Sequence, residues 1–300
     1  MNYNILKEKE PIIILGHNNA DYDSIASAYL LQILLNHLNI KNEIVIPDGI
    51  IPDTFDIKKY PFDYKTRLNK TDNVLLVDHN STQYTCNVVG CIDHHSKVES
   101  ITDTTIEKPQ TSCAKIIFDE LLSHNINIDK NIYFLAVQSL YYDSLSFNSK
   151  KAIETDRIWA DEICTLYNFN TKKLYNDGLM LTNLSNINQE TILNEYKMFN
   201  INGNSVGTSC AKVKNIPNEM MVENILNEVR YAKDINKADY WMYYLSCIED
   251  EKTIVFLLDN DKITKTEFDG LKSRSSDLKP LLEQQLPQKI QHINTDEKYR

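Results

Sequence analysis

The stretch PIIILGHNNADYDSIASAYLLQILLN, residues 11–36, decides how this chain is expected to fold. It begins with five apolar residues, and a polar turn then leads into a segment whose apolar residues recur with the period of a helix. A buried strand followed directly by a helix is typical of a parallel sheet with crossover helices. We therefore predict an α/β fold with a first strand at residues 11–15 and a helix at residues 24–36, capped by Ser24.

The same alternation of short apolar runs and helical segments continues through the first half of the chain. We expect further strands at residues 43–46, 74–77 and 88–92. Further helices are expected at residues 112–124, 132–142 and 155–167. Together these elements predict an N-terminal domain, residues 1–185, built on a parallel sheet.

A polar stretch at residues 182–189, TNLSNINQ, separates two helical patterns and is our predicted linker. Chains of about 300 residues are near the size at which one core divides into two. The expected second domain, residues 190–300, is a smaller α/β unit. Its predicted elements are helices at 190–199 and 218–233 and strands at 205–213, 240–248 and 253–259.

Composition argues against several classes of partner. The formal net charge is −10, so the chain lacks the clustered basic surface that binding to nucleic acid requires. The apolar run near the amino terminus is too short for a signal sequence or a membrane span. The six cysteines form no CxxC pair, which favours free thiols in a reducing compartment. We expect a cytoplasmic protein without a nucleic-acid or membrane partner.

Metal-binding types of side chain follow three of the predicted strands. His17, Asp21 and Asp23 form an HxxxDxD pattern after the first strand. Asp78 follows the strand at 74–77, and the sequence Asp-His-His at residues 93–95 ends the strand at 88–92. Because the carboxyl ends of parallel strands meet at one edge of a sheet, these side chains are expected to converge there.

Asp143 is a fourth candidate, in the segment YYDSLSF after an apolar helical run. An isolated carboxylate in apolar surroundings is costly, so Asp143 should be paired, act as a cap or bind a cation. Mixed carboxylate and imidazole ligands accept Mn, Mg, Co or Zn with overlapping affinity. The sequence therefore predicts a divalent metal site without naming the metal.

The segments HNNADYD, VDHN, IDHH and YYDSLSF, in this order, resemble the four motifs of the DHH phosphoesterase superfamily. The chain is most similar to the manganese-dependent, family II inorganic pyrophosphatases, in which a DHH domain precedes a smaller DHHA2 domain. The resemblance extends to residues 109–121 and to Thr155 and Asp156.

This resemblance implies two divalent metal ions, with Mn expected and Co or Mg as alternatives. The implied ligands are His17, Asp21, Asp23, Asp78, His94 and Asp143, with Asp78 bridging the two metals. His95 would donate a proton or hydrogen bond to the leaving phosphate, and Asp93 would orient a neighbouring histidine. In the second domain, Lys197 and Arg274 match phosphate-binding residues of the family. A homodimer formed by edge strands is also implied.

Two departures from the family pattern bear on the substrate. Ala20 stands where the family has Pro, which alters the stiffness of the turn. Ser275 stands where the family has Lys, and Asp277 occupies a Gln-like position, so one cationic contact to phosphate is lost. Lys272 or Lys279 could replace that contact if the backbone turns favourably.

The resemblance thus implies hydrolysis of pyrophosphate, a small phosphoanhydride, to two phosphates. An exopolyphosphatase or short-chain polyphosphatase is the first alternative, favoured by Ser275. A catalytically silent protein that binds phosphate ligands is the second. Nuclease or cyclic-dinucleotide phosphodiesterase activity is disfavoured, because those relatives carry a Gly-rich second domain and this region has only three glycines, Gly203, Gly207 and Gly270.

Overall fold

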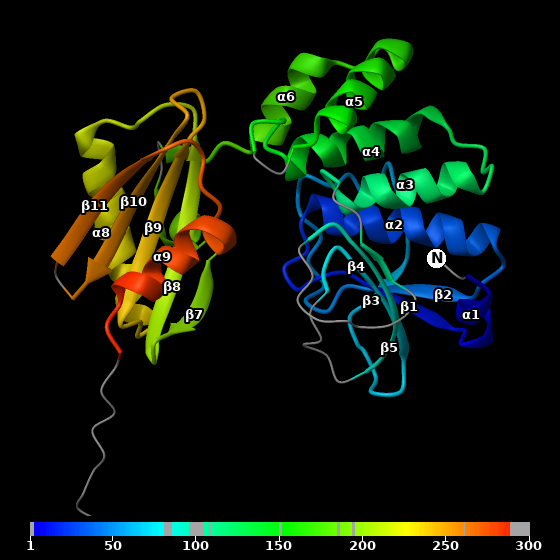
Figure 1. Cartoon of the computed structure of the whole chain (residues 1–300), viewed down its shortest axis with the longest axis horizontal. Coiled ribbons are helices and arrows are strands. Elements are labelled where there is room, and N and C mark those ends of the chain that lie inside the picture. Colours follow the sequence, from blue (N-terminus) through cyan, green and yellow to red (C-terminus); the bar gives the residue numbers. More distant parts are fainter. Residues whose placement is uncertain are drawn as a thin grey trace, which may run out of the picture. The chain divides into compact units, whose positions relative to one another are not determined.

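The computed structural model describes residues 3–80, 86–95, 105–107, 110–149, 152–184, 187–193, 196–260 and 262–288. The chain forms two compact units, Met1–Met180 and Leu181–Arg300 (Figure 1). The first is an α/β unit with a parallel sheet, so the predicted fold class is confirmed. No helix in the described part of the chain is long and apolar enough to cross a bilayer.

The sheet of the first unit has six strands in the order β3-β2-β1-β4-β5-β6, and all its pairings are parallel. The strands are β1 (Ile12–Leu15), β2 (Asn42–Val45), β3 (Tyr64–Lys65), β4 (Asn73–Val77), β5 (Asn87–Asp93) and β6 (Thr105–Glu107). The chain runs outward from β1 to β3 and then returns to place β4 on the other side of β1. The strand order therefore reverses between β1 and β4, where open α/β sheets bind their ligands.

Both faces of this sheet are buried. Ile12 and Ile14 lie in the large core that includes residues of the helices, whereas Ile13 and Leu15 pack with Val74 and its neighbours in a separate cluster. The unbroken apolar run of β1 follows from this two-sided burial.

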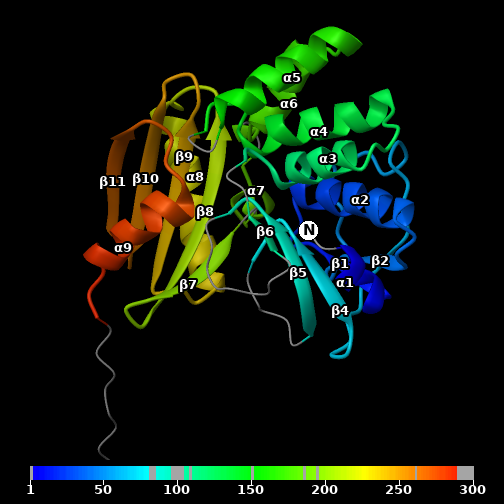
Figure 2. The same ribbon diagram turned by 45° about the vertical axis from the view of Figure 1, so that its right-hand side comes forward.

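The helices of the first unit are α1 (Tyr3–Glu8), α2 (Tyr22–His37), α3 (Cys113–Ser123), α4 (Lys130–Asp143), α5 (Glu154–Tyr167) and α6 (Thr171–Leu179). Helices α2 and α3 contact the strands and each other, α4 packs on both, and α5 and α6 pack on α4 (Figure 2). The capping prediction for α2 is wrong: the cap is Asp21, which accepts from the backbone N–H of Ser24.

The second unit has a five-stranded sheet in the order β11-β10-β9-β8-β7, in which only the β8–β9 pairing is parallel. Its strands are β7 (Lys197–Ile201), β8 (Asn204–Val213), β9 (Tyr240–Cys247), β10 (Lys252–Asp259) and β11 (Lys262–Asp269). Its helices are α7 (Gln189–Leu193), α8 (Glu219–Ile235), the π-helical turn η2 (Arg274–Leu278) and α9 (Lys279–Gln285).

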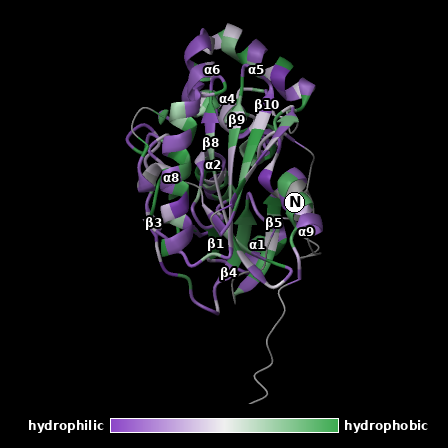
Figure 3. Cartoon of the chain, turned by 90° about the vertical axis from the view of Figure 1, so that its left-hand side faces the viewer, coloured by the Kyte–Doolittle hydropathy of each residue, from purple (hydrophilic) through white to green (hydrophobic). Residues whose placement is uncertain are grey.

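The two faces of the second sheet pack against different helices. One face packs with α8 through Ile225 and Val229, and the other with η2 and α9 through Leu278 and Leu282. Figure 3 shows β10 largely in the hydrophobic colour and α8 largely in the hydrophilic colour on its visible side. The helix therefore shields the sheet and presents polar side chains outward.

The helix predicted at residues 190–199 is wrong from Tyr196 onward, and residues 194–195 lie outside the described part of the chain. Residues from Lys197 onward form β7, which pairs antiparallel with β8 across a two-residue turn. Asn202 and Gly203 in this turn have φ angles of 53° and 81°, and Asn-Gly is a preferred sequence for such hairpins. Residues 197–199 form a strand and not a helix, because pairing with β8 satisfies their backbone N–H and C=O groups.

Substitution of Gly207 should destabilise the second unit. A Cβ at this position would lie 2.2 Å from Cε3 of Trp241, which is buried. We expect Gly207→Ala to lower the free energy of unfolding by about 1–3 kcal/mol. Trp159 and Trp241 are the only tryptophans, one in each unit, so denaturant unfolding followed by fluorescence in a Trp159→Phe background would report on the second unit.

The matched control is Thr266→Ala on β11, where the side chain is exposed. It should change the free energy of unfolding by no more than about 0.5 kcal/mol. Equal effects of the two substitutions would contradict the close approach of β8 to the Trp241 ring.

Candidate metal centre

The metal-type side chains gather where the strand order of the first sheet reverses. His17 follows β1, Asp78 follows β4 and His94 follows β5. Asp23 lies in the first turn of α2, and Asp143 is the last residue of α4. The structure thus brings side chains from three strand ends and two helices to one place.

Asp78 occupies the middle of this cluster. It is 2% exposed and adopts a left-handed conformation with φ of 61°, while its backbone N–H donates to the carbonyl of Ile92 on β5 at 3.0 Å. Its Oδ2 lies 3.4 Å from Nε2 of His17, and its Oδ1 lies 3.3 Å from Nε2 of His94. Each carboxylate oxygen therefore faces a different histidine, which is the arrangement a bridging carboxylate needs.

The first ligand group consists of His17, Asp21 and Asp78, with ligand atoms within 4.8 Å of one another. Nε2 of His17 lies 3.7 Å from Oδ1 of Asp21. The same Asp21 oxygen accepts from the N–H of Ser24 at 3.0 Å as the cap of α2. The start of the helix therefore holds this carboxylate next to His17.

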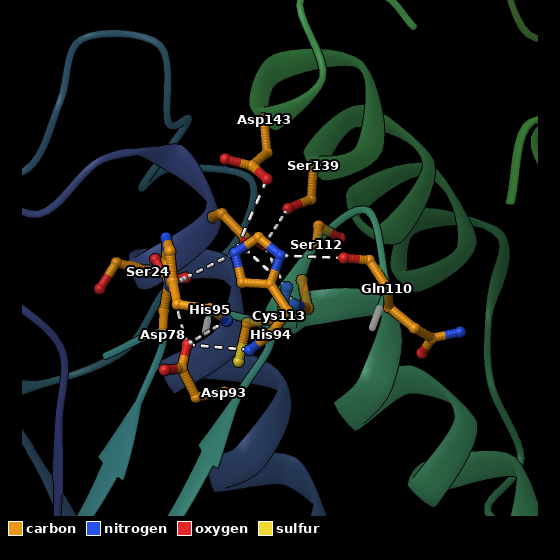
Figure 4. Close-up of polar contacts among 12 residues, drawn as sticks. Ser24, Asp78, Asp93, His94, His95, Gln110, Ser112, Cys113, Ser139 and Asp143 are labelled. Atoms are coloured by element: carbon orange, nitrogen blue, oxygen red, sulfur yellow. Dashed lines mark hydrogen bonds and ion pairs between the residues drawn. The ribbon is translucent and has the colours of Figure 1, made fainter. Parts of the chain in front are cut away.

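The second ligand group consists of Asp23, His94 and Asp143, also within 4.8 Å. Nε2 of His94 lies 3.7 Å from Oδ2 of Asp143 (Figure 4). The same nitrogen lies 3.9 Å from Oδ2 of Asp23. Since Asp78 lies beside both groups, the structure assembles all six predicted ligands. Their role in binding metal stays a prediction.

Asp23 is held by three hydrogen bonds. The backbone N–H groups of Cys113 and Ala114, in the first turn of α3, donate to it at 2.7 and 3.0 Å. The hydroxyl of Ser139 donates to the same carboxylate. Free N–H groups and the dipole at a helix start favour a negative charge, so α3 stabilises the ionised form of Asp23.

Both ligand histidines are oriented by backbone carbonyls. Nδ1 of His17 lies 2.9 Å from the carbonyl oxygen of Asn18, and Nδ1 of His94 lies 3.0 Å from that of Gln110. A carbonyl can only accept, so Nδ1 carries the proton in each ring. When the ring is neutral, Nε2 therefore has the lone pair and faces the cluster, as a metal ligand requires.

Asp93 supports the centre. It is fully buried, and its Oδ1 accepts from the backbone N–H groups of His94 and His95 and from Nδ1 of His95, at 2.8, 3.2 and 2.9 Å. Its Oδ2 accepts from the side chain of Asn80 at 2.8 Å. Because its oxygens accept these hydrogen bonds, Asp93 supports His94, His95 and Asn80. The side chain of His95 is 43% exposed and presents its other nitrogen, Nε2.

The two histidines offset part of the negative charge of the cluster. Burial lowers the pKa of His17, but hydrogen bonds with Asp21 and Asp78 raise it to about 11. Burial likewise lowers the pKa of His94, but Asp78 and Asp143 raise it to about 10. Burial and the charges of Asp78 and Asp143 raise the pKa of Asp23 well above its usual range. A divalent cation would reverse these preferences, so the donor set fits a metal.

Lys197 and Arg274 lie in the second unit. Lys197 is the first residue of β7 and is exposed, and Arg274 begins η2 and is half-buried. Their role as phosphate ligands stays a prediction.

The structure describes some of the side chains around Arg274. Oδ2 of Asp277 accepts from the N–H of Ser273 at 2.8 Å. Nζ of Lys279 lies 5.6 Å from the centre of the Phe199 ring and 3.5 Å from Glu283. The side chain of Ser275 lies outside the described residues.

Three supporting residues were not predicted from the sequence: Ser139, Gln110 and Asn80. Ser139 could have been found, since it precedes Asp143 by four residues and so shares its helix face. Asn80 lies within the VDHN motif. Gln110 contributes its backbone carbonyl to His94, and a backbone carbonyl leaves no sequence signal.

Comparison with known proteins agrees with this architecture. Residues 11–140 match the family described as DHH family, N-terminal domain. A relative from Lactococcus lactis, named "Probable manganese-dependent inorganic pyrophosphatase", is 24% identical over 274 residues, covering 83% of this chain and 86% of the relative. A protein of the same name from Shouchella clausii is 27% identical over 267 residues, covering 82% and 85%.

The fold also matches a solved structure from Methanococcus jannaschii, described as a candidate family II inorganic pyrophosphatase. The TM-score is 0.66 at 19% identity, covering 91% of this chain and 98% of that one. The fold and the site define a two-unit α/β protein with a candidate metal centre, and the findings support a hydrolase. More particularly, residues 11–140 match the N-terminal domain of the DHH family, and the resemblance seen in the sequence is confirmed.

Metal binding should release protons and strengthen as the pH rises. In the metal-free protein, the raised pKa values of His17 and His94 keep both rings protonated at neutral pH. A metal must displace these protons, so the affinity for Mn²⁺ should rise about tenfold per pH unit for each proton released. Calorimetric titration between about pH 6 and pH 8, in buffers of different ionisation enthalpy, measures both quantities.

Two variants control this measurement. His17→Gln should release fewer protons, whereas His37→Gln, at an exposed position in the last turn of α2, should behave as the parent chain. Binding without proton release would contradict the protonated state of the two rings.

Proposed function

We propose that the chain hydrolyses inorganic pyrophosphate to two phosphates with the help of two divalent metal ions, Mn being the expected metal. The observation that carries the proposal is the position of Asp78, whose two oxygens face His17 on one side and His94 on the other. The names of the relatives from Lactococcus lactis and Shouchella clausii support the same reaction and the same metal.

When bound, two such ions supply an activated water and neutralise charge on the attacked phosphoryl group. The chain holds their ligands rigidly. His17 and Asp21 are held by the turn after β1 and the start of α2, and Asp23 by the start of α3. These backbone contacts fix the ligands before substrate arrives, so little reorganisation is needed.

His95 is proposed to act on the substrate directly. Its Nδ1 is held by the buried Asp93, and its half-exposed ring presents Nε2 away from that contact. A histidine held in this way can donate a proton or hydrogen bond to a phosphate oxygen. Lys197 and Arg274 are proposed to bind the phosphates of the small phosphoanhydride substrate, with Arg able to make a bidentate contact. The proposed setting is the cytoplasm, and a homodimer remains part of the proposal.

A short-chain polyphosphatase or exopolyphosphatase is the second candidate, because Ser275 stands where the resembled family has a cationic Lys. Phosphate release from pyrophosphate and tripolyphosphate, with Mn²⁺ present, separates the two candidates. A preference for tripolyphosphate in kcat/KM of more than about tenfold would overturn our first choice. Retention of two Mn²⁺ per chain without turnover of either substrate would favour a binding protein.

Replacing Asp78 should abolish activity. Asp78→Ala removes a carboxylate that belongs to the first ligand group and lies 3.3 Å from His94 of the second. We expect kcat/KM for pyrophosphate to fall by more than about a hundredfold, together with loss of metal. Metal content and phosphate release are measured on the same preparation. Asp63→Ala, at an exposed loop position, is the control and should retain both. Full activity of Asp78→Ala would refute the two-metal proposal.

Replacing Lys197 should weaken substrate binding more than turnover. A charge-assisted hydrogen bond to phosphate contributes about 1.5–3 kcal/mol, so we expect Lys197→Ala to raise KM roughly tenfold or more with a smaller change in kcat. Lys262→Ala, at an exposed position on β11, is the control. An unchanged KM in Lys197→Ala would remove this residue from the proposed substrate site.

A further inference from the structure

We propose that Asp156, in the first turn of α5, is a positioning residue for His94: it holds the segment at Gln110 and Thr111 so that the Gln110 carbonyl fixes the His94 ring. The consequence for metal binding rests on the proposed function, in which His94 is a ligand. The positioning itself is a property of the chain and can be measured without metal.

The orientation of the His94 ring depends on one backbone carbonyl. The ring is almost fully buried, and its Nδ1 is bound to the Gln110 carbonyl at 3.0 Å (Figure 4). Its Nε2 lies 3.3 Å from Asp78 and 3.7 Å from Asp143. A shift or rotation of the carbonyl would turn the ring and move Nε2 away from these carboxylates.

Asp156 fixes that carbonyl from outside the cluster. Gln110 precedes α3 and belongs to no helix or strand. The next residue, Thr111, is fully buried, and its N–H donates to Oδ2 of Asp156 at 2.8 Å. The side chain of Gln110 reaches Oδ1 of the same carboxylate at 3.5 Å. One buried carboxylate therefore binds two groups: the backbone N–H that follows the Gln110 carbonyl, and the side chain of Gln110.

The start of α5 makes this contact reciprocal. Its N-cap residue is Ile153, which has no polar side chain, and the N–H of Ile153 donates instead to Oγ1 of Thr111 at 3.0 Å. Asp156 is the third residue of the helix and accepts from Thr111 in return. In an ordinary capping box both side chains belong to one helix. Here Thr111 supplies the capping oxygen from another segment, so the helix start and the Gln110 segment hold each other in place.

The carboxylate of Asp156 is suited to this position. A buried carboxylate is costly unless it is hydrogen-bonded, and Asp156 has two donors as well as the favourable dipole at the start of α5. Ala at this position would leave the N–H of Thr111 without its acceptor. Asn would keep one acceptor oxygen for that N–H.

The test measures the His94 ring directly. In metal-free protein, nitrogen-15 NMR detects the Nδ1–H protons of His94 and His17, which are assigned by substitution of each histidine. We expect Asp156→Ala to shift the His94 signal and speed its exchange with water, while the His17 signal is unchanged. Asp156→Asn should keep the His94 signal near its original position. Asp161→Ala, at an exposed position on α5, is the matched control.

Thr111→Val separates positioning from capping. It removes the oxygen that caps α5 but keeps the N–H that Asp156 accepts, so the His94 signal should stay while thermal stability falls. If Asp156→Ala does not fold, Asp156→Ser removes the carboxylate with a smaller loss of volume and is measured in the same way. An unchanged His94 signal in the folded Ala or Ser variant would overturn the proposal and leave Asp156 as a helix cap only.

Metal affinity gives a second readout. Removal of a group that orients a ligand histidine typically weakens metal binding by about 10–100-fold. We expect Asp156→Ala to weaken one of two Mn²⁺ binding events by this factor. If the parent chain fails to hydrolyse pyrophosphate but the His94 signal responds to Asp156→Ala, the proposed function is wrong and the positioning role stands. If the chain is active and the His94 signal does not respond, the positioning role is wrong and the proposed function stands.

Discussion

Repulsion among the carboxylates of Asp23, Asp78 and Asp143 is the constraint that the candidate metal centre has to satisfy. These side chains converge in a buried place where like charges are poorly screened, and the pKa of Asp23 is raised as a result. His17 and His94 offset part of this charge. The remaining negative charge of the cluster must also be compensated, and divalent cations do so most directly.

The backbone provides much of that compensation before any cation binds. The start of α3 donates two N–H groups to Asp23, and backbone carbonyls hold Nδ1 of both ligand histidines. Strand ends and helix starts meet where the order of a parallel sheet reverses, so this edge offers backbone donors and acceptors together. The cluster is therefore held by secondary structure, and Asp93 and Ser139 add the remaining hydrogen bonds.

The second unit departs from the pattern of the resembled family, whereas the predicted metal ligands of the first unit match that pattern. Around Arg274 this chain has Asp277 instead of a neutral residue, and Asp277 accepts from the backbone of its own turn. Lys279 lies against Phe199 and Glu283. The six predicted metal ligands have no comparable departure. Differences in specificity are therefore expected to come from the second unit.

The sequence alone determined the α/β class and the identity of the clustered side chains, because buried strands and ligand-type residues at their ends are local patterns. It failed at residues 197–199, where pairing with β8 overrode a helical pattern, and at the cap of α2. Only the tertiary structure decided that Asp78 lies between His17 and His94, and that Gln110 and Asp156 hold His94 in place. These contacts join segments distant in the chain, and several use backbone groups, which every residue has and no sequence pattern can distinguish.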